Sequence, residues 1–470
     1  MNVQVNPAET ALAMYETACE THMRRDWREA CHALAKALKL QLAANASRAA
    51  IDTAMPVPAL VKVKAPAKAK AAPVTGFDMS AGSLASAFKL LAKVTEKRNH
   101  IPIVAHTHML ATGDTLQLTA TDLDMEILIQ VDAPGIGQWE AAAETHAVLA
   151  MLAKFPKGAQ VTLQGESLET HTWKHEGKDC SETLTRVTVQ CAGSTATLAG
   201  RDLADYPHMV AKWGDAPPAF YMPSDALADA LAFVTPSIST EETRYYLNGA
   251  YVHVMPGKKP ALRVVSTDGH RASVWETRDV PKGAESMPGV IIPRKAVSVA
   301  RAFLAQSDRI LLTVSPSHVE IGAGPVRLIS KLIDGSFPEY TRIIPRDNAK
   351  VATFDSESMT DAVSRVAHAA QDPRKPVIRF TFGDDDGASV RLATKSPEGA
   401  AADYATAIDW KEPESLEIGF NGAYVREMMG QFGPGLVAMR FADGASPVLV
   451  APAKESGPVS RLTVLMPIRV

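Results

Sequence analysis

The stretches GFDMSAGSLASAFKLLAKV (residues 76–94), AFYMPSDALADALAFVTPS (219–237) and ATFDSESMTDAVSRVAHAA (352–370) open one pattern three times along the chain. Each begins with a short extended segment, passes through a cap that contains serine, and continues with apolar residues at helical spacing. An alternating strand pair, a second short helix and more strands follow each opening. The openings lie roughly 140 residues apart, so the repeated unit is a domain and not a solenoid repeat.

The three repeats are predicted to span about 77–215, 216–349 and 350–470. Helices placed between meandering strands predict an α+β fold with antiparallel sheets and helices on one face. A protein made of three copies of one domain is usually architectural. The repeat therefore favours an arc, a ring or a scaffold over an enzyme cleft.

Two further segments precede the repeats. Residues 1–54 are predicted to form a helical N-terminal extension, because 8–46 carry an amphipathic helical pattern. Residues 55–76 are rich in Ala, Pro and Lys and predict a solvated, semi-extended linker. The extension is either a helical handle for a partner or a loosely fixed appendage, and the sequence leaves both open.

Composition excludes several classes of protein. The chain has 470 residues, 46% of them hydrophobic and 21% charged, which is ordinary for a globular protein. Its net charge of -3 argues against a generally basic nucleic-acid coat but allows a local basic surface. No run approaches the ~18 apolar residues that a membrane span needs, and no signal peptide is evident, so we expect a cytoplasmic protein without membrane partners. The cysteines show no CxxC spacing and are expected to be reduced: Cys19, Cys31, Cys180 and Cys191.

Catalytic and metal sites are not expected. Asp122 with Asp124, and the run 384–386 (Asp384, Asp385, Asp386), invite a Mg²⁺ hypothesis, but their positions favour turns. His106 and His108 are two residues apart without a third ligand nearby. Because no phosphate loop or nucleophile motif occurs, we predict no catalytic residue, no metal and no cofactor. Metal-dependent phosphoryl transfer remains only an alternative.

Six segments in repeats two and three go beyond pattern. They are TRYYLNG (243–249), VVSTDGHR (264–271), VIIPRKAV (290–297), SKLIDGSFPEYTRIIP (330–345), IGFNGAYV (418–425) and VLMPIRV (464–470). In this order and at these distances they resemble the bacterial DNA polymerase III subunit beta family, the replication sliding clamps. The resemblance covers roughly residues 77–470 and leaves an unusual N-terminal extension outside it.

The resemblance implies three DNA-clamp domains (77–215, 216–349 and 350–470), which form half of a six-domain ring. Helices would line the central hole and antiparallel sheets would form the outside. Two chains would close head to tail as a homodimer around duplex DNA and tether the replicative polymerase. The chain would then be a non-catalytic processivity factor whose partners are double-stranded DNA and the peptides of DNA polymerases and the clamp loader.

A sliding ring must contact phosphates and avoid reading base edges. Lys89, Lys93 and Lys97 lie four apart on one predicted helix face, where a merely solvated face is the alternative interpretation. Glu241 locally weakens the DNA interpretation, and Asp225 with Asp229 is expected to cap a helix and compensate its dipole. From these residues and the resemblance, the predicted DNA-binding set is Lys89, Lys93, Arg98, Arg244, Tyr245, Tyr246, Arg294 and Lys295.

The resemblance also implies a groove for extended partner peptides between repeats two and three. Such a groove combines apolar walls, a few polar anchors and a flexible methionine. Ala272 and Pro447 depart from the family pattern and predict a reshaped groove. The implied residues are Leu247, Thr267, Gly269, His270, Arg271, Pro338, Arg342, Ile343, Asn421, Tyr424, Val464, Leu465, Met466, Pro467, Ile468 and Arg469.

Ring closure is the least supported expectation. Residues 396–408 are poor in acids where the family's interface often carries them, and Ala369 and Ala370 replace bulky aliphatics. The stretch TWKHEGKDC (172–180) is insertion-like. We expect a weaker or differently specified dimer contact. The alternative function is therefore a specialised, accessory or decoy clamp-fold protein that binds clamp partners without stable ring closure.

Overall fold

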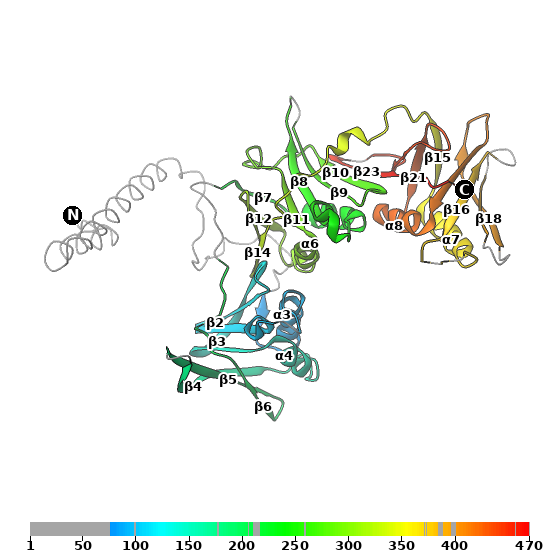
Figure 1. The fold of residues 1–470 in the computed structure, drawn as a ribbon. Coiled ribbons are helices and arrows are strands. Elements are labelled where there is room, and N and C mark those ends of the chain that lie inside the picture. The colour runs from blue at the N-terminus through cyan, green and yellow to red at the C-terminus, as the bar shows by residue number, and fades with distance from the viewer. Residues whose placement is uncertain are drawn as a thin grey trace, which may run out of the picture. The chain divides into compact units, whose positions relative to one another are not determined.

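The computed structural model describes residues 76–97, 100–175, 178–204, 206–209, 217–257, 260–370, 372, 374–383, 389–395, 401–455 and 457–469. The chain divides into two compact units, and every described residue belongs to the second, Ala72–Val470 (Figure 1). The predicted extension, the linker up to residue 75, Arg98 and the aspartates 384–386 lie outside the described residues.

The first repeat folds around a capped helix. Its elements are β1 (Phe77–Asp78), α3 (Ala81–Val94), β2 (His106–Thr121), β3 (Met125–Glu144), α4 (Thr145–Leu152), β4 (Val161–His175), β5 (Lys178–Cys191) and β6 (Ser194–Ala199). The Ser80 side chain accepts a hydrogen bond from the Ser83 amide at the start of α3, which confirms the predicted serine cap. Of the insertion-like stretch, residues 172–175 of β4 pair with 178–181 of β5.

The second repeat begins differently from the prediction. Its elements are β7 (Ala219–Pro223), α5 (Ser224–Val234), the 3₁₀ turn η4 (Glu242–Leu247), β8 (Gly249–Met255), β9 (Ala261–Thr267), β10 (Arg271–Thr277), β11 (Val290–Pro293), α6 (Arg294–Arg301), β12 (Arg309–Val314), β13 (His318–Ala323) and β14 (Val326–Lys331). Pro223, not a serine, precedes α5, and the Ser224 hydroxyl donates to the Leu304 carbonyl. The predicted serine cap is wrong here because that hydroxyl is used inside the domain.

In the third repeat, a carboxylate side chain caps the first helix and an amide side chain caps the second. Its elements are the 3₁₀ turn η6 (Tyr340–Arg342), β15 (Lys350–Asp355), α7 (Ser356–Ala367), β16 (Val377–Phe382), β17 (Ser389–Lys395), β18 (Ala401–Ala407), β19 (Asp409–Trp410), β20 (Leu416–Asn421), α8 (Gly422–Phe432), β21 (Leu436–Phe441), β22 (Val448–Pro452) and β23 (Val459–Leu465). Asp355, not Ser356, caps α7 by accepting from the Ser358 amide at 2.8 Å. Hydrogen bonds from Ser358 lower the pKa of this carboxyl.

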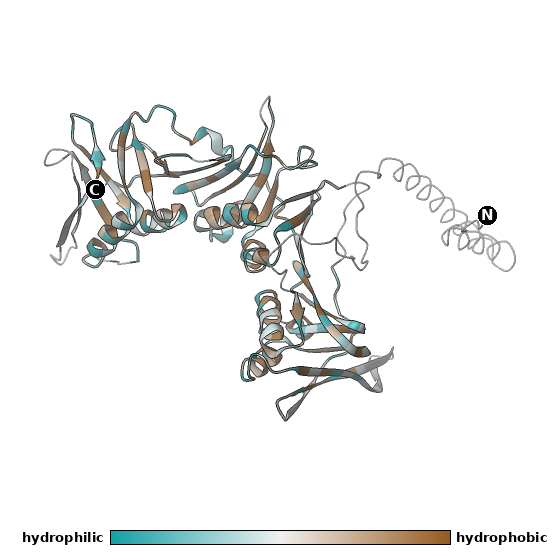
Figure 2. Ribbon diagram, turned by 180° about the vertical axis from the view of Figure 1, so that it is seen from behind, coloured by the Kyte–Doolittle hydropathy of each residue, from teal (hydrophilic) through white to brown (hydrophobic). Residues whose placement is uncertain are grey.

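Two of the sheets run from one domain into the next. In one, β14 of the second domain pairs antiparallel with β3 of the first, and in the other, β10 of the second pairs antiparallel with β23 of the third. Two smaller sheets, β4-β5-β6 and β18-β17-β16-β20, stay within the first and third domains. Helices pack in pairs within each domain (α3 with α4, α5 with α6, α7 with α8), and apolar residues mark strands and helices in all three (Figure 2).

Lysines of the second domain cross the seam with the first. Lys295 Nζ donates to the Val94 carbonyl at 2.8 Å and contacts Asp122 Oδ2 at 2.5 Å. Lys331 Nζ lies 3.0 Å from Asp124 Oδ1. Because Val94 is the last residue of α3, Lys295 satisfies a free helix-end carbonyl as well as a nearly buried carboxylate.

The seam between the second and third domains centres on Asp229. Its Oδ2 accepts from Trp275 Nε1 at 2.7 Å and lies 2.6 Å from Arg461 Nη2 of β23. Nearby, Gln431 of α8 donates to the Ser273 hydroxyl at 2.9 Å. The expectation that Asp229 serves the start of its own helix is therefore wrong, because the carboxylate lies on the side of α5 that faces the third domain. Asp225 lies in the first turn, where a carboxylate compensates the helix dipole, but Pro223 is the N-cap and no side chain caps α5. Only the dipole part of the expectation therefore fits Asp225.

Two histidines are buried in the first domain. His108 Nε2 lies 2.7 Å from Glu140 Oε1, and its ring contacts those of Tyr206 and His208. Tyr206 donates to the Thr119 carbonyl at 2.9 Å, which pins the end of the domain to β2. Burial, more than any neighbour, lowers the pKa of both His106 and His108 from the usual 6.5.

These histidines predict acid sensitivity. Because the native pKa of His106 and His108 is below 6.5, the unfolded chain binds more protons than the native chain as pH falls below 6.5. The free energy of unfolding therefore decreases. His108→Asn is expected to make this decrease shallower between pH 7.5 and 5.5, measured by urea denaturation. The same substitution at the exposed His368 is the control. Equal slopes for wild type and His108→Asn would contradict the assignment.

Candidate nucleic-acid interface and peptide groove

The lysines of α3 form one exposed row. Lys89 and Lys93 are exposed, whereas Leu84, Phe88 and Leu91 on the opposite side of the helix are buried in the core. Lys93 also lies in the last turn, where a cation is favourable for the helix dipole. The row is therefore available to a polyanion.

A second group of predicted DNA-binding residues lines one open hollow. Tyr245, Arg294 and Lys295 line it together, although they come from η4 and α6. Tyr245 is 54% exposed, and Arg294 is exposed beside it. An aromatic ring and a guanidinium at one opening suit a phosphate and sugar backbone. The remaining lining residues are Ser239, Thr240, Asn248, Pro293, Ser298 and Ile333.

Arg244 is held by a carboxylate of its own segment. Glu241 Oε2 lies 2.7 Å from Arg244 Nε and 2.6 Å from Nη2. The other face of the guanidinium lies against Gly269, where a Cβ would lie 2.6 Å from Nη1 and where φ is +88°. The positive φ favours glycine at this position, and Arg244, which precedes Tyr245 of the hollow, lies against the turn at 267–271.

Lys295 differs from its neighbour Arg294. Its ammonium is already bonded to Val94 and Asp122 across the domain seam. A phosphate would compete with a nearly buried carboxylate for it. Contact between Lys295 and DNA stays a prediction, and the seam gives this residue a structural task that the sequence did not reveal.

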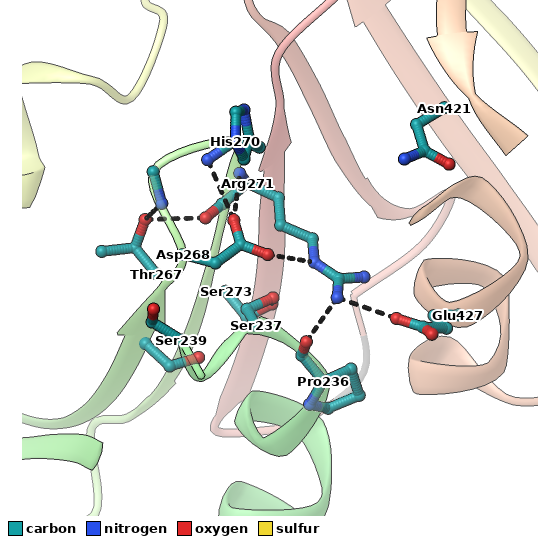
Figure 3. Close-up of polar contacts among 12 residues, drawn as sticks. Pro236, Ser237, Ser239, Thr267, Asp268, His270, Arg271, Ser273, Asn421 and Glu427 are labelled. Atoms are coloured by element: carbon teal, nitrogen blue, oxygen red, sulfur yellow. Dashed lines mark hydrogen bonds and ion pairs between the residues drawn. The ribbon is translucent and has the colours of Figure 1, made fainter. Parts of the chain in front are cut away.

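The turn Thr267–Arg271 contains four of the residues predicted for the peptide groove. Asp268 Oδ1 accepts from the amides of His270 and Arg271, at 2.9 and 3.0 Å, while Thr267 Oγ1 donates to the Arg271 carbonyl at 2.7 Å. These contacts hold His270 at the surface and direct Arg271 inward (Figure 3). The sequence VVSTDGHR thus forms a rigid hairpin turn with a buried arginine at its end.

Arg271 ties the groove to the third domain. The residue is 6% exposed, and its guanidinium contacts Asp268 at 3.0 Å and Glu427 of α8 at 2.8 Å. It also donates to Pro236 O at 2.5 Å (Figure 3). Its guanidinium carbon lies 4.3 Å from the centre of the Tyr424 ring. This set of contacts combines charge, hydrogen bonding and a cation–π contact at the seam.

The C-terminal tail and α8 form one side of the groove. Met466 N donates to the His270 carbonyl at 2.9 Å, and Ile468 N donates to the Gly419 carbonyl at 2.8 Å. Met466 and Ile468 expose their side chains, whereas Val464 and Leu465 are buried in β23. Asn421 caps α8 by accepting from the Ala423 amide, and Tyr424 follows one turn later. The structure therefore brings the predicted tail and α8 residues next to the turn.

The connector between domains two and three supplies the remaining residues. Pro338, Arg342 and Ile343 are exposed there. Gly335 lies close to Tyr246, since a Cβ on it would approach the Tyr246 Cβ to 3.0 Å. The connector thus runs beside η4, whose last residue, Leu247, is buried.

The two departures from the family pattern have distinct surroundings. Ala272 is buried and pairs with Thr267 and Val464 in the sheet. The Pro447 carbonyl accepts from Asn348 Nδ2 at 2.9 Å. Ala272 is thus part of the strand pairing, whereas Pro447 precedes β22 and bonds to a side chain. The effect of both residues on groove depth stays a prediction.

Sequence reasoning missed two carboxylates of this site. Asp268 belongs to VVSTDGHR, and its position before Gly269 is typical of a side chain that accepts hydrogen bonds from the following amides. Glu427 carried no signal, because only the fold places α8 beside β10. Its distance of three residues from Tyr424 puts both on one helix face once that neighbour is known.

The carboxylates and histidines that suggested a metal and lie among the described residues have other partners. Asp122 accepts from the amides of Asp124 and Met125 and pairs with Lys295. His106 Nδ1 contacts the Pro102 carbonyl, whereas His108 contacts Glu140. Within the described residues no three His, Cys, Asp or Glu side chains cluster as a metal site would require. No described helix is long and apolar enough to span a membrane.

Solved structures of sliding clamps are similar to this chain. The crystal structure of the C. crescentus beta sliding clamp, with PEG bound to its putative beta-motif tethering region, is 34% identical and superposes with a TM-score of 0.70, covering 83% of this chain and 98% of that chain. The Bartonella birtlesii sliding clamp bound to griselimycin is 28% identical, with a TM-score of 0.70 and coverage of 82% and 97%. A beta sliding clamp of Caulobacter vibrioides is 37% identical over 405 residues, 83% of this chain and 98% of the relative.

Three domains with shared sheets, together with the likeness to these structures, define a DNA-clamp protein. Family models for DNA polymerase III beta subunit match its N-terminal domain at residues 75–210, its central domain at 221–339 and its C-terminal domain at 341–469. The chain belongs to the DNA polymerase III beta subunit family. The predicted family and fold class are confirmed.

Glu241→Gln is expected to strengthen DNA binding. Removing the carboxylate frees Arg244 for a phosphate, which should raise affinity about two- to fivefold at low salt and steepen the salt dependence by about one phosphate contact. Fluorescence anisotropy with a labelled duplex measures both. Glu242→Gln, at the exposed neighbour, is the matched control. Unchanged or weaker binding by Glu241→Gln would contradict this role.

The adjacent residues 294 and 295 should separate binding from stability. Arg294→Gln should weaken duplex binding and leave thermal unfolding unchanged, because its side chain is exposed. Lys295→Met should lower the free energy of unfolding by about 1–2 kcal/mol, because it leaves Asp122 without its cation. Anisotropy and calorimetry on both variants test this. A Lys295→Met protein that loses DNA binding at full stability would contradict the assignment.

Proposed function

We propose that this chain is a DNA sliding clamp that closes around duplex DNA as a head-to-tail homodimer and tethers a DNA polymerase. In this role it is a processivity factor without catalysis of its own, and it acts in the cytoplasm. The proposal is supported by beta sliding clamps that this chain matches over almost their full length. Ring closure rests on one observation: among the described strands, one sheet of the first domain and one sheet of the third domain contain no strand of another domain.

The sheet arrangement supports closure by a second copy. Each domain contributes strands to two sheets, and inside the chain two sheets are shared by neighbouring domains. The sheet β4-β5-β6 at the first domain and β18-β17-β16-β20 at the third are left with neighbours only from their own domain. Joining these two between copies would repeat the construction of the internal seams. Such a head-to-tail contact closes as a ring when the rotation per domain is right.

The charged residues support sequence-independent contact with DNA. Lys89, Lys93, Arg294 and Arg244 carry exposed or half-exposed cations on the first two domains. The exposed face of α7, in contrast, carries two acids, Glu357 and Asp361, and one base, Arg365, in its last turn. We therefore expect phosphate contacts to concentrate on domains one and two. Contacts with phosphates alone allow sliding, since phosphates look alike at every base pair.

The groove between domains two and three is proposed to bind extended peptides of polymerases and the clamp loader. A short apolar peptide fits its exposed Met466, Ile468 and Ile343 beside the anchors at the 267–271 turn. The related Bartonella clamp binds griselimycin. We propose that this chain also binds griselimycin, which makes it a usable probe of the groove.

A second function keeps the groove but not the ring. Residues 396–408 are poor in acids, and Ala369 and Ala370 place small side chains just after α7. Residues 396–400 lie outside the described residues. A specialised or decoy clamp that binds clamp partners without stable closure fits these features, and the experiment below separates it from a closed ring.

Loading onto nicked circular DNA followed by linearisation tests the proposal. A closed ring should stay on the circle through a high-salt wash, should leave after cutting, and should stay on cut DNA whose ends are blocked by streptavidin. Gel filtration with labelled protein measures retention. Protein that stays on unblocked linear DNA, or is never retained on circles, would contradict a closed ring. Griselimycin binding without retention would favour the second function.

A further inference from the structure

The connector between β14 and β15 has an outward and an inward side. Pro338, Arg342 and Ile343, of the predicted groove, are exposed. Phe337, Tyr340 and Ile344 pack inward on the sheet, with Val265 and Val274 of the second domain and Leu462 of the third. Because Val274 and Leu462 are paired across the β10–β23 seam, the inward side covers the junction between the two domains.

One hydroxyl group, that of Tyr340, forms hydrogen bonds between this connector and the sheet. Among the described residues, the hydrogen bonds that leave the stretch 334–347 end at Tyr340 Oη, which lies 3.0 Å from Arg263 Nη1 and 3.0 Å from His253 Nε2. The other hydrogen bonds of the stretch are internal, such as Tyr340 N to the Pro338 carbonyl and Ile343 N to the Tyr340 carbonyl. Tyr340 is 4% exposed, so water does not replace these bonds.

The chemistry of the three groups defines the direction of each bond. An arginine can only donate, so Arg263 donates to the hydroxyl, and the hydroxyl proton goes to His253 Nε2. Burial, aided by Arg263, lowers the pKa of His253 to about 4, which keeps the ring neutral and able to accept. Arg263 is fixed in turn by Glu276 at 2.6 Å.

Aromatic stacking restrains the same cluster from the side. The His253 ring stacks on Tyr251 with centroids 4.6 Å apart, and Tyr251 stacks on Phe337 at 4.8 Å with an interplanar angle of 7°. The stack limits tilting of the connector, whereas the hydroxyl fixes its position along the sheet. Both contacts lie within a few residues of Pro338, Arg342 and Ile343.

We propose that the Tyr340 hydroxyl, held by Arg263 and His253, is the positioning group that fixes the connector wall of the peptide groove; this rests on the proposed partner-binding function. A wall held in place before binding costs less ordering when a ligand arrives. Loss of one buried hydrogen-bonded group should therefore weaken ligand binding about three- to tenfold.

Tyr340→Phe keeps the ring and removes only the hydroxyl. With griselimycin as the probe, the full chain carrying Tyr340→Phe should show about three- to tenfold higher Kd than wild type by calorimetry. Hydrogen exchange of residues 334–347 should rise in the free protein while β8, β9 and β10 keep their protection. Tyr251→Phe, the same change in the same stack but outside the three-group hydrogen bond, should leave both readouts unchanged.

The outcomes separate this inference from the proposed function. Wild-type chain that does not bind griselimycin would contradict the groove itself. Wild type that binds, with Tyr340→Phe binding equally well, would overturn the positioning role and leave the groove intact. A rise in exchange across β8, β9 and β10 together with the connector would make Tyr340 an ordinary core residue and would also overturn the inference.

Discussion

Antiparallel backbone pairing across the domain seams is the constraint on which the structure depends. Strand β14 continues the first domain's sheet through β3, and β10 continues into the third domain through β23. Backbone hydrogen bonds demand a specific register, and a slip of one residue would turn every side chain of a strand to the other face. Paired strands of neighbouring domains therefore meet in one defined register.

Both candidate sites follow from this pairing. At the first seam, α3 and α6 meet where Lys295 reaches the end of α3, so the lysine row and Arg294 belong to one junction. At the second, the 267–271 turn leads directly into β10, and the C-terminal tail leaves β23 beside it. The groove is thus a product of the β10–β23 pairing. The connector then covers the same junction through Tyr340.

Much of this arrangement was predictable from residue order. The threefold opening predicts the repeated helices, and the alternation of Leu116, Leu118, Ile127 and Ile129 predicts strands whose apolar side chains are in fact fully buried. VVSTDGHR predicts a turn with a surface histidine. The roles of Lys295, Asp229 and Glu427 were not predictable, because each depends on a residue from another domain. A charged side chain on a helix face looks the same in sequence whether it meets a phosphate, a seam or water.

The central claim is that the two unshared sheets, β4-β5-β6 and β18-β17-β16-β20, are completed by a second copy of the chain. Sedimentation velocity across nanomolar to micromolar concentration tests this most directly. A closed ring predicts a concentration-dependent species of twice the 50.3 kDa chain mass, and no larger assembly, because a head-to-tail pair closes on itself. A single species at the mass of one chain up to micromolar concentration would contradict it.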